Sequence, residues 1–163
     1  MNKIKRTKYQ MFLNILSLLV LIGTTLYLII YWDSIPQKIP GHYNGSGIID
    51  RWGNKNELWI ILVIGIIMYI GLSVIEYYPK IWNSGIEDNE INRKQEYSLT
   101  REMLVYEKFF LTINFAYLTI NSSLSLSLPK WYTLVFVGLS LGVIVIYLIR
   151  IILLNRSSRE KHI

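Results

Sequence analysis

The chain has 163 residues, of which 52% are hydrophobic and 13% aromatic, and this composition excludes an ordinary soluble globular domain. Its net charge of +6 does not indicate a nucleic-acid partner, because the basic residues flank apolar blocks and form no extended stripe. The absence of cysteine excludes disulfides, thiolate metal sites and a cysteine nucleophile.

Four long apolar blocks are the main elements that the sequence predicts. The first covers about residues 11–31; it is too long for the apolar part of a signal peptide and lacks a small-residue cleavage site, so we expect a retained span. The second, residues 58–78, is rich in Leu, Ile and Val, each of which favours insertion by about 0.3 to 0.6 kcal/mol. The fourth, residues 131–154, is equally apolar. The third, residues 109–128, mixes apolar residues with Thr, Asn and Ser, so its insertion needs a separate argument.

The distribution of basic residues supplies that argument. If all four blocks span, thirteen of the 17 Lys and Arg residues lie on one side of the membrane and four on the other. The positive-inside rule then places both termini and the loop 79–108 in the cytoplasm and the loop 32–57 outside. Frequent Ile, Asn and Lys, whose codons are AT-rich, favour a low-GC Gram-positive bacterium. The sequence therefore predicts an all-α protein of the bacterial cell membrane, with four transmembrane helices.

Between the second and third blocks we expect a cytoplasmic loop, in which residues 83–100 form a surface hairpin or a short helix. Glu76 precedes Lys80 by four residues, which predicts an ion pair at the cytoplasmic end of the second helix.

Polar and small residues within the blocks predict how the helices pack. Asn14, Asn114 and Asn121 are expected to form hydrogen bonds across helices. No carboxylate falls near the middle of a predicted span, which argues against a transport path along these amides. Gly138 and Gly142 permit close approach of a helix, either within the chain or from a second copy.

The loop between the first two blocks, residues 32–57, is longer than a bare connection between helices requires. Pro36 and Pro40 restrict φ and predict a stiff, extended arm. Residues 44–47, Asn-Gly-Ser-Gly, have the chemistry of a turn that leads back toward the second helix. We therefore expect this loop to be folded.

A motif in this loop resembles a known family. Residues 39–55 read I-P-x-H-Y-N-x-x-G-x-x-D-x-W-G-x-K, which looks like the signature of the bacterial domain of unknown function 1648. That domain also stands at the front of SdpI-type toxin-immunity membrane proteins, and the resemblance covers about residues 12–78. It implies a small multipass membrane protein with a role in protection from a membrane-active peptide and in signalling to a cytoplasmic regulator. The candidate site residues in this loop are Pro36, Pro40, His42, Tyr43, Asn44, Gly47, Asp50, Trp52, Gly53 and Lys55.

His42 and Asp50 carry the chemistry of the loop. An imidazole and a carboxylate that converge in a turn can bind a metal or act as an acid and base. Two ligands are too few for a closed zinc site, so we predict neither a metal nor a cofactor. In the structural alternative, His42 and Asn44 hold the turn, while Asp50 pairs with Arg51, Lys55 or a backbone amide.

The aromatic residues of the loop have two interpretations. Trp52 and Tyr43 are candidates for a stacking platform that binds a lipid headgroup or a peptide. Other aromatic residues near the ends of the blocks, such as Trp32 and Trp59, are typical of the aromatic belt at a membrane interface.

We find no set of nucleophile, base and orienting group, no phosphate-binding Gly loop and no metalloprotease motif, so we expect a protein that is not an enzyme. The leading hypothesis is that the exported loop binds a membrane-active peptide or a lipid headgroup, in toxin immunity or in signalling to a cytoplasmic regulator. The alternative is an accessory subunit of a transporter or another membrane complex. A third hypothesis is an intramembrane enzyme that uses His42 and Asp50.

Overall fold

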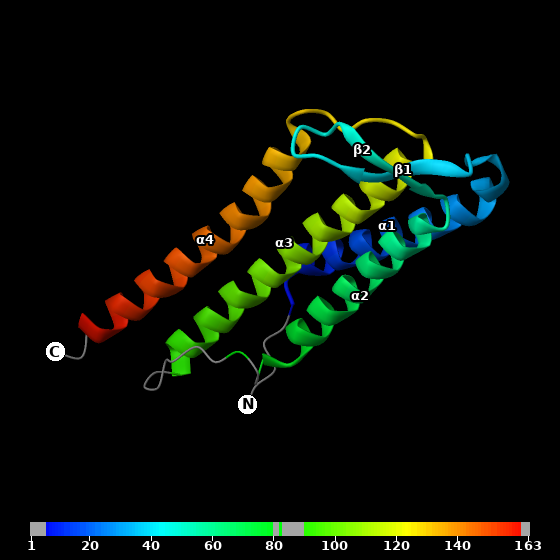
Figure 1. Cartoon of the computed structure of the whole chain (residues 1–163). Coiled ribbons are helices and arrows are strands. Elements are labelled where there is room, and N and C mark those ends of the chain that lie inside the picture. The colour runs from blue at the N-terminus through cyan, green and yellow to red at the C-terminus, as the bar shows by residue number, and fades with distance from the viewer. Residues whose placement is uncertain (1–5, 80–81, 83–89, 161–163) are drawn as a thin grey trace.

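The computed structural model describes residues 6–79, 82 and 90–160, and consists mostly of long helices with one small β-hairpin (Figure 1). The elements in chain order are α1 (Lys8–Tyr31), the 3-10 turn η1 (Trp32–Ser34), β1 (Lys38–Tyr43), β2 (Ile49–Asn54), α2 (Glu57–Tyr77), α3 (Glu90–Ser123) and α4 (Tyr132–Glu160). In the described part of the chain, four helices are long and apolar enough to cross a membrane. The prediction of a mostly helical, multipass membrane fold is confirmed to that extent.

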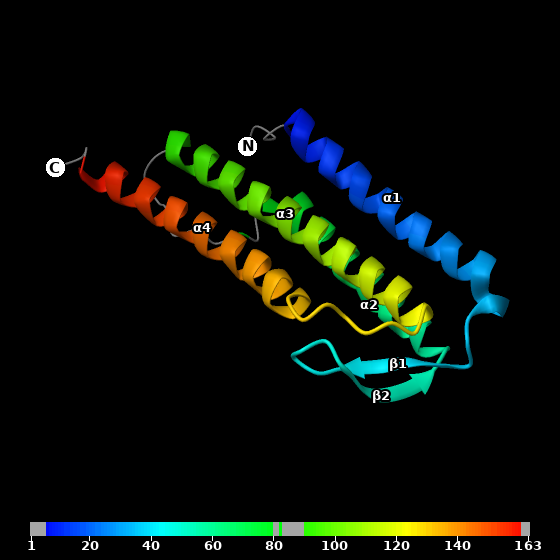
Figure 2. The ribbon, with the colours of Figure 1, turned by 90° about the horizontal axis from the view of Figure 1, so that it is seen from above.

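Helix α3 lies at the centre of the molecule. It packs against α1, α2 and α4, and no comparable seam joins α4 to α1 or α2 within the described residues. Figures 1 and 2 show α3 between its neighbours from two directions. We call the end of the molecule that carries the β-hairpin and residues 124–131 the hairpin end. The opposite end, where α1 begins and α4 ends, is the termini end.

Helix α3 is also the element that differs most from the prediction. It begins at Glu90 instead of about residue 109, so residues 90–108, predicted as part of a cytoplasmic loop, are helical. The stretch contains neither Gly nor Pro and is rich in good helix formers, so nothing in it interrupts the helix. The helix ends at Ser123 instead of residue 128, and Ser125 just beyond has a left-handed φ of 57°. The remainder of the predicted surface element, residues 83–89, lies outside the described residues.

The other predicted boundaries are closer to the observed ones. Helix α1 begins at Lys8, three residues before the expected start, because Thr7 and Gln10 form a reciprocal capping box. Helix α4 continues to Glu160, beyond the predicted end at residue 154.

The β-hairpin forms where turn chemistry predicts a reversal. Strands β1 and β2 are antiparallel, with Lys38 opposite Asn54. The Asn44 carboxamide oxygen accepts hydrogen bonds from the amides of Ser46 and Ile48, each at 3.0 Å. Gly47 completes the turn with a φ of 78°, a conformation that a residue without Cβ adopts at little cost.

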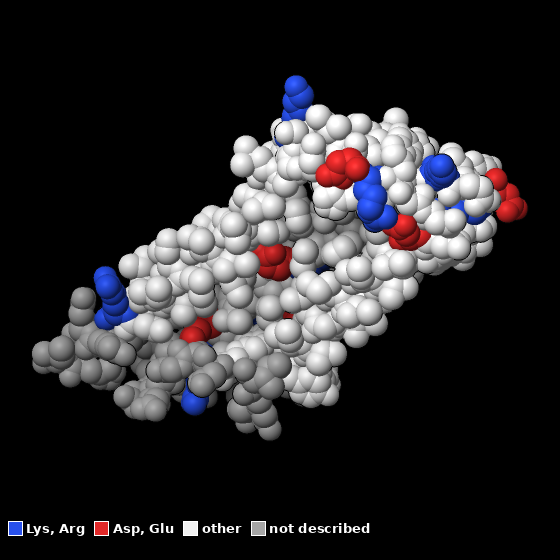
Figure 3. Space-filling model, viewed as in Figure 1, with Lys and Arg blue, Asp and Glu red and all other residues white. Residues whose placement is uncertain are grey.

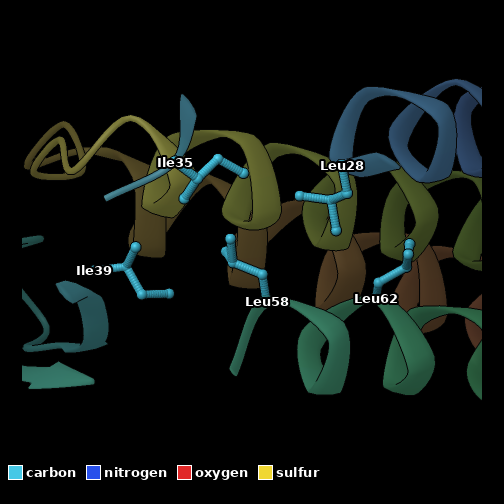
Figure 4. Close-up of a cluster of buried hydrophobic side chains, with 5 residues drawn as sticks. All are labelled: Leu28, Ile35, Ile39, Leu58 and Leu62. Carbon is cyan, nitrogen blue, oxygen red and sulfur yellow. The ribbon is translucent and has the colours of Figure 1, made fainter. Parts of the chain in front are cut away.

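An apolar cluster fastens the hairpin to the helices. Ile35, which precedes β1, and Ile39 of β1 pack with Leu28 of α1 and with Leu58 and Leu62 of α2, as Figure 4 shows. Burial of side chains of this size contributes about 1.5 to 3 kcal/mol each. The hairpin is therefore anchored to the ends of two helices.

Candidate functional site

Tyr43 docks the hairpin on the far end of α3. Its hydroxyl lies 3.0 Å from the Ser122 hydroxyl, donates to the Leu126 carbonyl at 3.0 Å and accepts from the Asn121 amide at 3.2 Å. These partners lie about 80 residues away in the sequence. The motif in the first loop is therefore hydrogen-bonded to the end of α3 and to the connection between α3 and α4. The sequence predicts a hydrogen bond from Asn121 to another helix, but the Asn121 amide bonds to Tyr43 of the hairpin and to the Leu126 carbonyl of the following loop.

Gly47 makes a second connection to that loop. The Leu128 amide donates to the Gly47 carbonyl at 2.8 Å, and a Cβ built on Gly47 would collide with the Leu128 carbonyl. Glycine is required here both by the positive φ and by this close approach. The turn of the hairpin is thus fixed against residues 124–131.

A cavity of about 320 Å³ lies beneath the hairpin. Residues 40–44 of the loop motif form one wall, and the other walls come from α2, α3 and the start of α4. The polar groups of the wall include Asn114, Ser122 and Tyr132, while Leu118 and Phe136 are among its apolar groups. Nothing in the sequence connects the loop motif with the polar third helix. In the structure, residues of both line the same cavity.

A hydrogen bond between two helices joins two residues of the cavity wall. The Tyr132 hydroxyl of α4 donates to the Asn114 carboxamide of α3, and the Tyr132 ring stacks on Tyr117 with ring centroids 4.9 Å apart. The prediction that Asn114 bonds across helices is confirmed. Asn14, in contrast, donates to the Gln10 carbonyl of its own helix.

His42, which also lines the cavity, forms a solvent-exposed pair with Asp50 on the hairpin. The imidazole Nδ1 atom lies 2.6 Å from a carboxylate oxygen of Asp50, and the two side chains are 64% and 43% exposed. The pair is brought together by the register of β1 and β2, in which His42 lies opposite Arg51. Within residues 6–79, 82 and 90–160, no three His, Asp or Glu side chains are grouped to hold a metal ion.

Arg51 and Glu57 tie β2 to the start of α2. A guanidinium nitrogen lies 2.9 Å from the Glu57 carboxylate and donates to the Gly41 carbonyl at 2.5 Å. The hydrogen bond to Glu57 raises the pKa of Arg51 above its ordinary value. A Cβ on Gly53 would meet the Glu57 carboxylate, so a larger residue there would require the end of the Glu57 side chain to move. The predicted partners of Asp50 are Arg51, Lys55 or a backbone amide, but its carboxylate pairs with His42, and Arg51 pairs with Glu57.

The remaining motif residues serve the hairpin in different ways. The Lys55 ammonium donates to the Trp32 carbonyl at 3.3 Å and lies 4.7 Å from the centroid of the Trp32 ring. Pro40 is buried and lines the cavity, whereas Pro36 is exposed. Trp52 is 54% exposed and makes no ring contact with Tyr43 in the described structure. Their role as a stacking platform for a lipid headgroup or a peptide stays a prediction.

A buried charge network at the termini end was missed by the sequence analysis. Glu76 of α2 pairs with Lys108 of α3 at 2.6 Å and with Arg6 at 2.7 Å, and Lys108 also donates to the Ser73 hydroxyl at 3.1 Å. The predicted partner of Glu76, Lys80, lies outside the described residues. The missed signal is spacing: Lys108, Thr112, Phe115 and Thr119 follow one face of a helix that starts before residue 109.

On the face that Figure 3 shows, charged side chains gather over the hairpin and toward the termini end, and the surface between these regions is mostly uncharged, apart from acidic atoms in a hollow. This distribution is that of a protein whose middle lies in lipid.

Comparison with known proteins adds one finding. Residues 19–67 match the model of a family described as "Domain of unknown function (DUF1648)", a segment that comprises the second half of α1, the whole hairpin and the first half of α2. The match supports the resemblance drawn from the loop motif. No curated protein and no solved structure matches the chain.

Proposed function

We propose that this chain is a non-enzymatic protein of the bacterial cell membrane that binds an apolar segment of a membrane-active peptide in the cavity beneath the hairpin, and so protects the cell that makes it. The observation that carries this proposal is the cavity itself, with loop residues 40–44 on one side and α3 and α4 on the other. It has the size and the mixed lining of small-ligand sites. The resemblance to the N-terminal part of SdpI-type immunity proteins supports toxin immunity as the role of this binding.

The chemistry of the cavity wall favours a peptide over a lipid headgroup. Among the described residues that line the cavity there is no Lys or Arg to receive a phosphate. The wall offers apolar groups together with the uncharged Asn114, Ser122 and Tyr132, which suit an apolar side chain and a peptide carbonyl or amide. An anionic headgroup would lose its hydration here without gaining an opposite charge.

The same wall favours binding over catalysis. Ser122 is bonded to the phenol of Tyr43, and Tyr132 donates to the Asn114 amide, so neither hydroxyl contacts a base that would activate it. His42 also lines the cavity, but its imidazole pairs with the exposed Asp50, and the hydroxyls of Ser122 and Tyr132 have the partners named above.

The orientation follows from the same proposal. With the hairpin end outside and both termini in the cytoplasm, the basic residues of the termini end obey the positive-inside rule. The cavity then lies at the outer leaflet, where a peptide that attacks the cell inserts first.

A killing assay tests the proposal. A sensitive strain that expresses the chain is exposed to a panel of synthetic membrane-active peptides, and we expect higher survival than with the empty vector for at least one peptide. Leu118→Trp fills the cavity and should abolish the protection. Leu139→Trp is the matched control, because Leu139 is 48% exposed on α4 and does not line the cavity. Equal killing with and without the wild-type protein would overturn the proposal.

The second candidate function is an accessory subunit of a larger membrane complex, and the outer face of α4 favours it. A Cβ built on Gly138 or Gly142 meets nothing within 4 Å, so these glycines do not serve packing within the chain. Residues Leu134, Leu141 and Leu153 of α4 are exposed. Purification in a mild detergent distinguishes the two candidates, because an accessory subunit should carry a larger partner in fixed stoichiometry.

A further inference from the structure

The face of α3 between α2 and α4 forms the floor of an open groove. Figure 3 shows the surface hollowed along the middle of the molecule, with acidic atoms visible in the hollow. Helix α4 packs against α3 but does not pack to a similar extent against α2 within the described residues. The groove between α2 and α4 is therefore open along its length.

One stripe of α3 side chains lines this groove. Asn114, Leu118 and Ser122 line the cavity beneath the hairpin, and Glu107 and Leu111 precede them at the spacing of one helical face. Lys108, the next residue along the chain, reaches Glu76 of α2. Glu107 therefore lies on the same face as the cavity, about 10 Å from Asn114 along the helix axis at 1.5 Å per residue.

Glu107 is a buried carboxylate that lacks a complete set of partners. The residue is 8% exposed, and its Oε1 atom has no hydrogen-bond partner among the described residues. The Ser140 hydroxyl of α4 lies close enough to interact with the Glu107 carboxyl, but its oxygen, which is shielded from solvent, meets no hydrogen-bond geometry with it among the described residues. Glu76, Glu57 and Glu102, in contrast, each lie within 4.0 Å of a basic group.

An unpaired carboxylate inside a membrane span is costly and marks a functional site. Ser140 lies about 12 Å inside the start of α4, at 1.5 Å per residue, so Glu107 beside it is not at a helix end. A cation supplied by a ligand would remove the cost, because an opposite charge at close range is strongly favoured where water is excluded.

We propose that Glu107 receives a Lys or Arg side chain of the bound peptide, so that the groove recognises an apolar helix with one basic residue about 10 Å from the segment that enters the cavity. This inference rests on the proposed function and specifies the chemistry of its ligand. The cavity binds the apolar end of the peptide, and Glu107 favours peptides that carry a basic side chain at the matching position.

The test uses the full chain in lipid nanodiscs and synthetic peptides as probes. Each probe is an apolar Leu and Ala helix of about 20 residues with one Lys about seven residues from either its amino or its carboxyl end. Each has a counterpart with norleucine in place of Lys. Dissociation constants are measured by energy transfer from the protein's tryptophans to a dansyl group on the peptide.

We expect one Lys peptide to bind the wild-type protein about tenfold tighter than its norleucine counterpart, a preference typical of a desolvated charge pair. Glu107→Gln should abolish the preference and Glu107→Asp should keep part of it. Glu102→Gln is the matched control, because Glu102 lies on α3 but already has Arg150 at 3.8 Å. This variant should keep the full preference.

The outcomes separate the two proposals. Equal binding of Lys and norleucine peptides to the wild-type protein, with both weakened by Leu118→Trp, would overturn the role of Glu107 and leave the cavity as the binding site. Binding that Leu118→Trp does not weaken would overturn the proposed function. The comparison of the two peptides on the wild-type protein needs no variant, so it stands even if Glu107→Gln fails to fold.

Discussion

The carboxylate of Glu76 and the ammonium of Lys108 lie 2.6 Å apart, and their side chains are 0% and 2% exposed. The pair joins α2 to α3 near the termini end, and Arg6 and Ser73 complete it. A buried charge is tolerated in a membrane-spanning helix when an opposite charge and further hydrogen bonds surround it. The pair therefore explains how α3 carries charged residues into the molecule.

Removal of one partner of this pair should destabilise the protein. Glu76→Ala leaves Lys108 buried without its counter-ion, and we expect the free energy of unfolding to fall by about 3 to 5 kcal/mol. The double variant Glu76→Leu with Lys108→Leu should recover most of the loss, because no charge remains buried. Unfolding by SDS in mixed micelles measures the effect. Losses below about 1 kcal/mol for Glu76→Ala would contradict a buried pair.

The Tyr43 hydroxyl should hold the hairpin against α3. Tyr43→Phe leaves the Asn121 amide and the Leu126 carbonyl without this partner, which costs about 1 to 3 kcal/mol. We expect faster trypsin cleavage after Arg51 in the variant, since local opening of the hairpin becomes more frequent. Tyr77→Phe is the control, because Tyr77 is 64% exposed. Equal cleavage rates in the two variants would show that the hairpin is held by other contacts.

Gly47 and Gly45 lie two residues apart in the same turn and should respond differently to a methyl group. Gly47→Ala places a Cβ at a φ of 78° and against the Leu128 carbonyl, so we expect a loss of about 1 to 3 kcal/mol in stability. A Cβ on Gly45 meets nothing within 4 Å, and Gly45→Ala should be nearly neutral. Thermal unfolding in detergent compares the two. Similar midpoints for both variants would place the turn away from residues 124–131.

The sequence predicted the elements whose causes are local. The apolar blocks give α1, α2 and α4 because hydropathy and length alone distinguish a span. The turn at Asn44 to Gly47 follows from residues that favour reversal wherever they occur. The loop motif drew attention to the segment that forms the hairpin and one wall of the cavity.

Features that depend on distant partners could not be read in this way. The apolar block that predicts the third span begins only after Lys108, and the partners of this residue, Glu76 and Ser73, are supplied by the fold. Glu107 also precedes residue 109, where the third apolar block begins, so the sequence does not predict a carboxylate within that span. The contact of Tyr43 with Ser122 joins residues far apart in the sequence, and no local pattern indicates it.

The central claim is that the hairpin stands outside the cell and the chain ends inside it. Because the chain has no cysteine, single cysteines report their own position without background. Ser46→Cys places a thiol in the exposed turn, and Ser157→Cys places one on the exposed surface near the end of α4. A membrane-impermeant maleimide applied to intact cells should label Ser46→Cys at once and Ser157→Cys only after the membrane is opened. Labelling of Ser157→Cys in intact cells, with Ser46→Cys protected, would contradict the account.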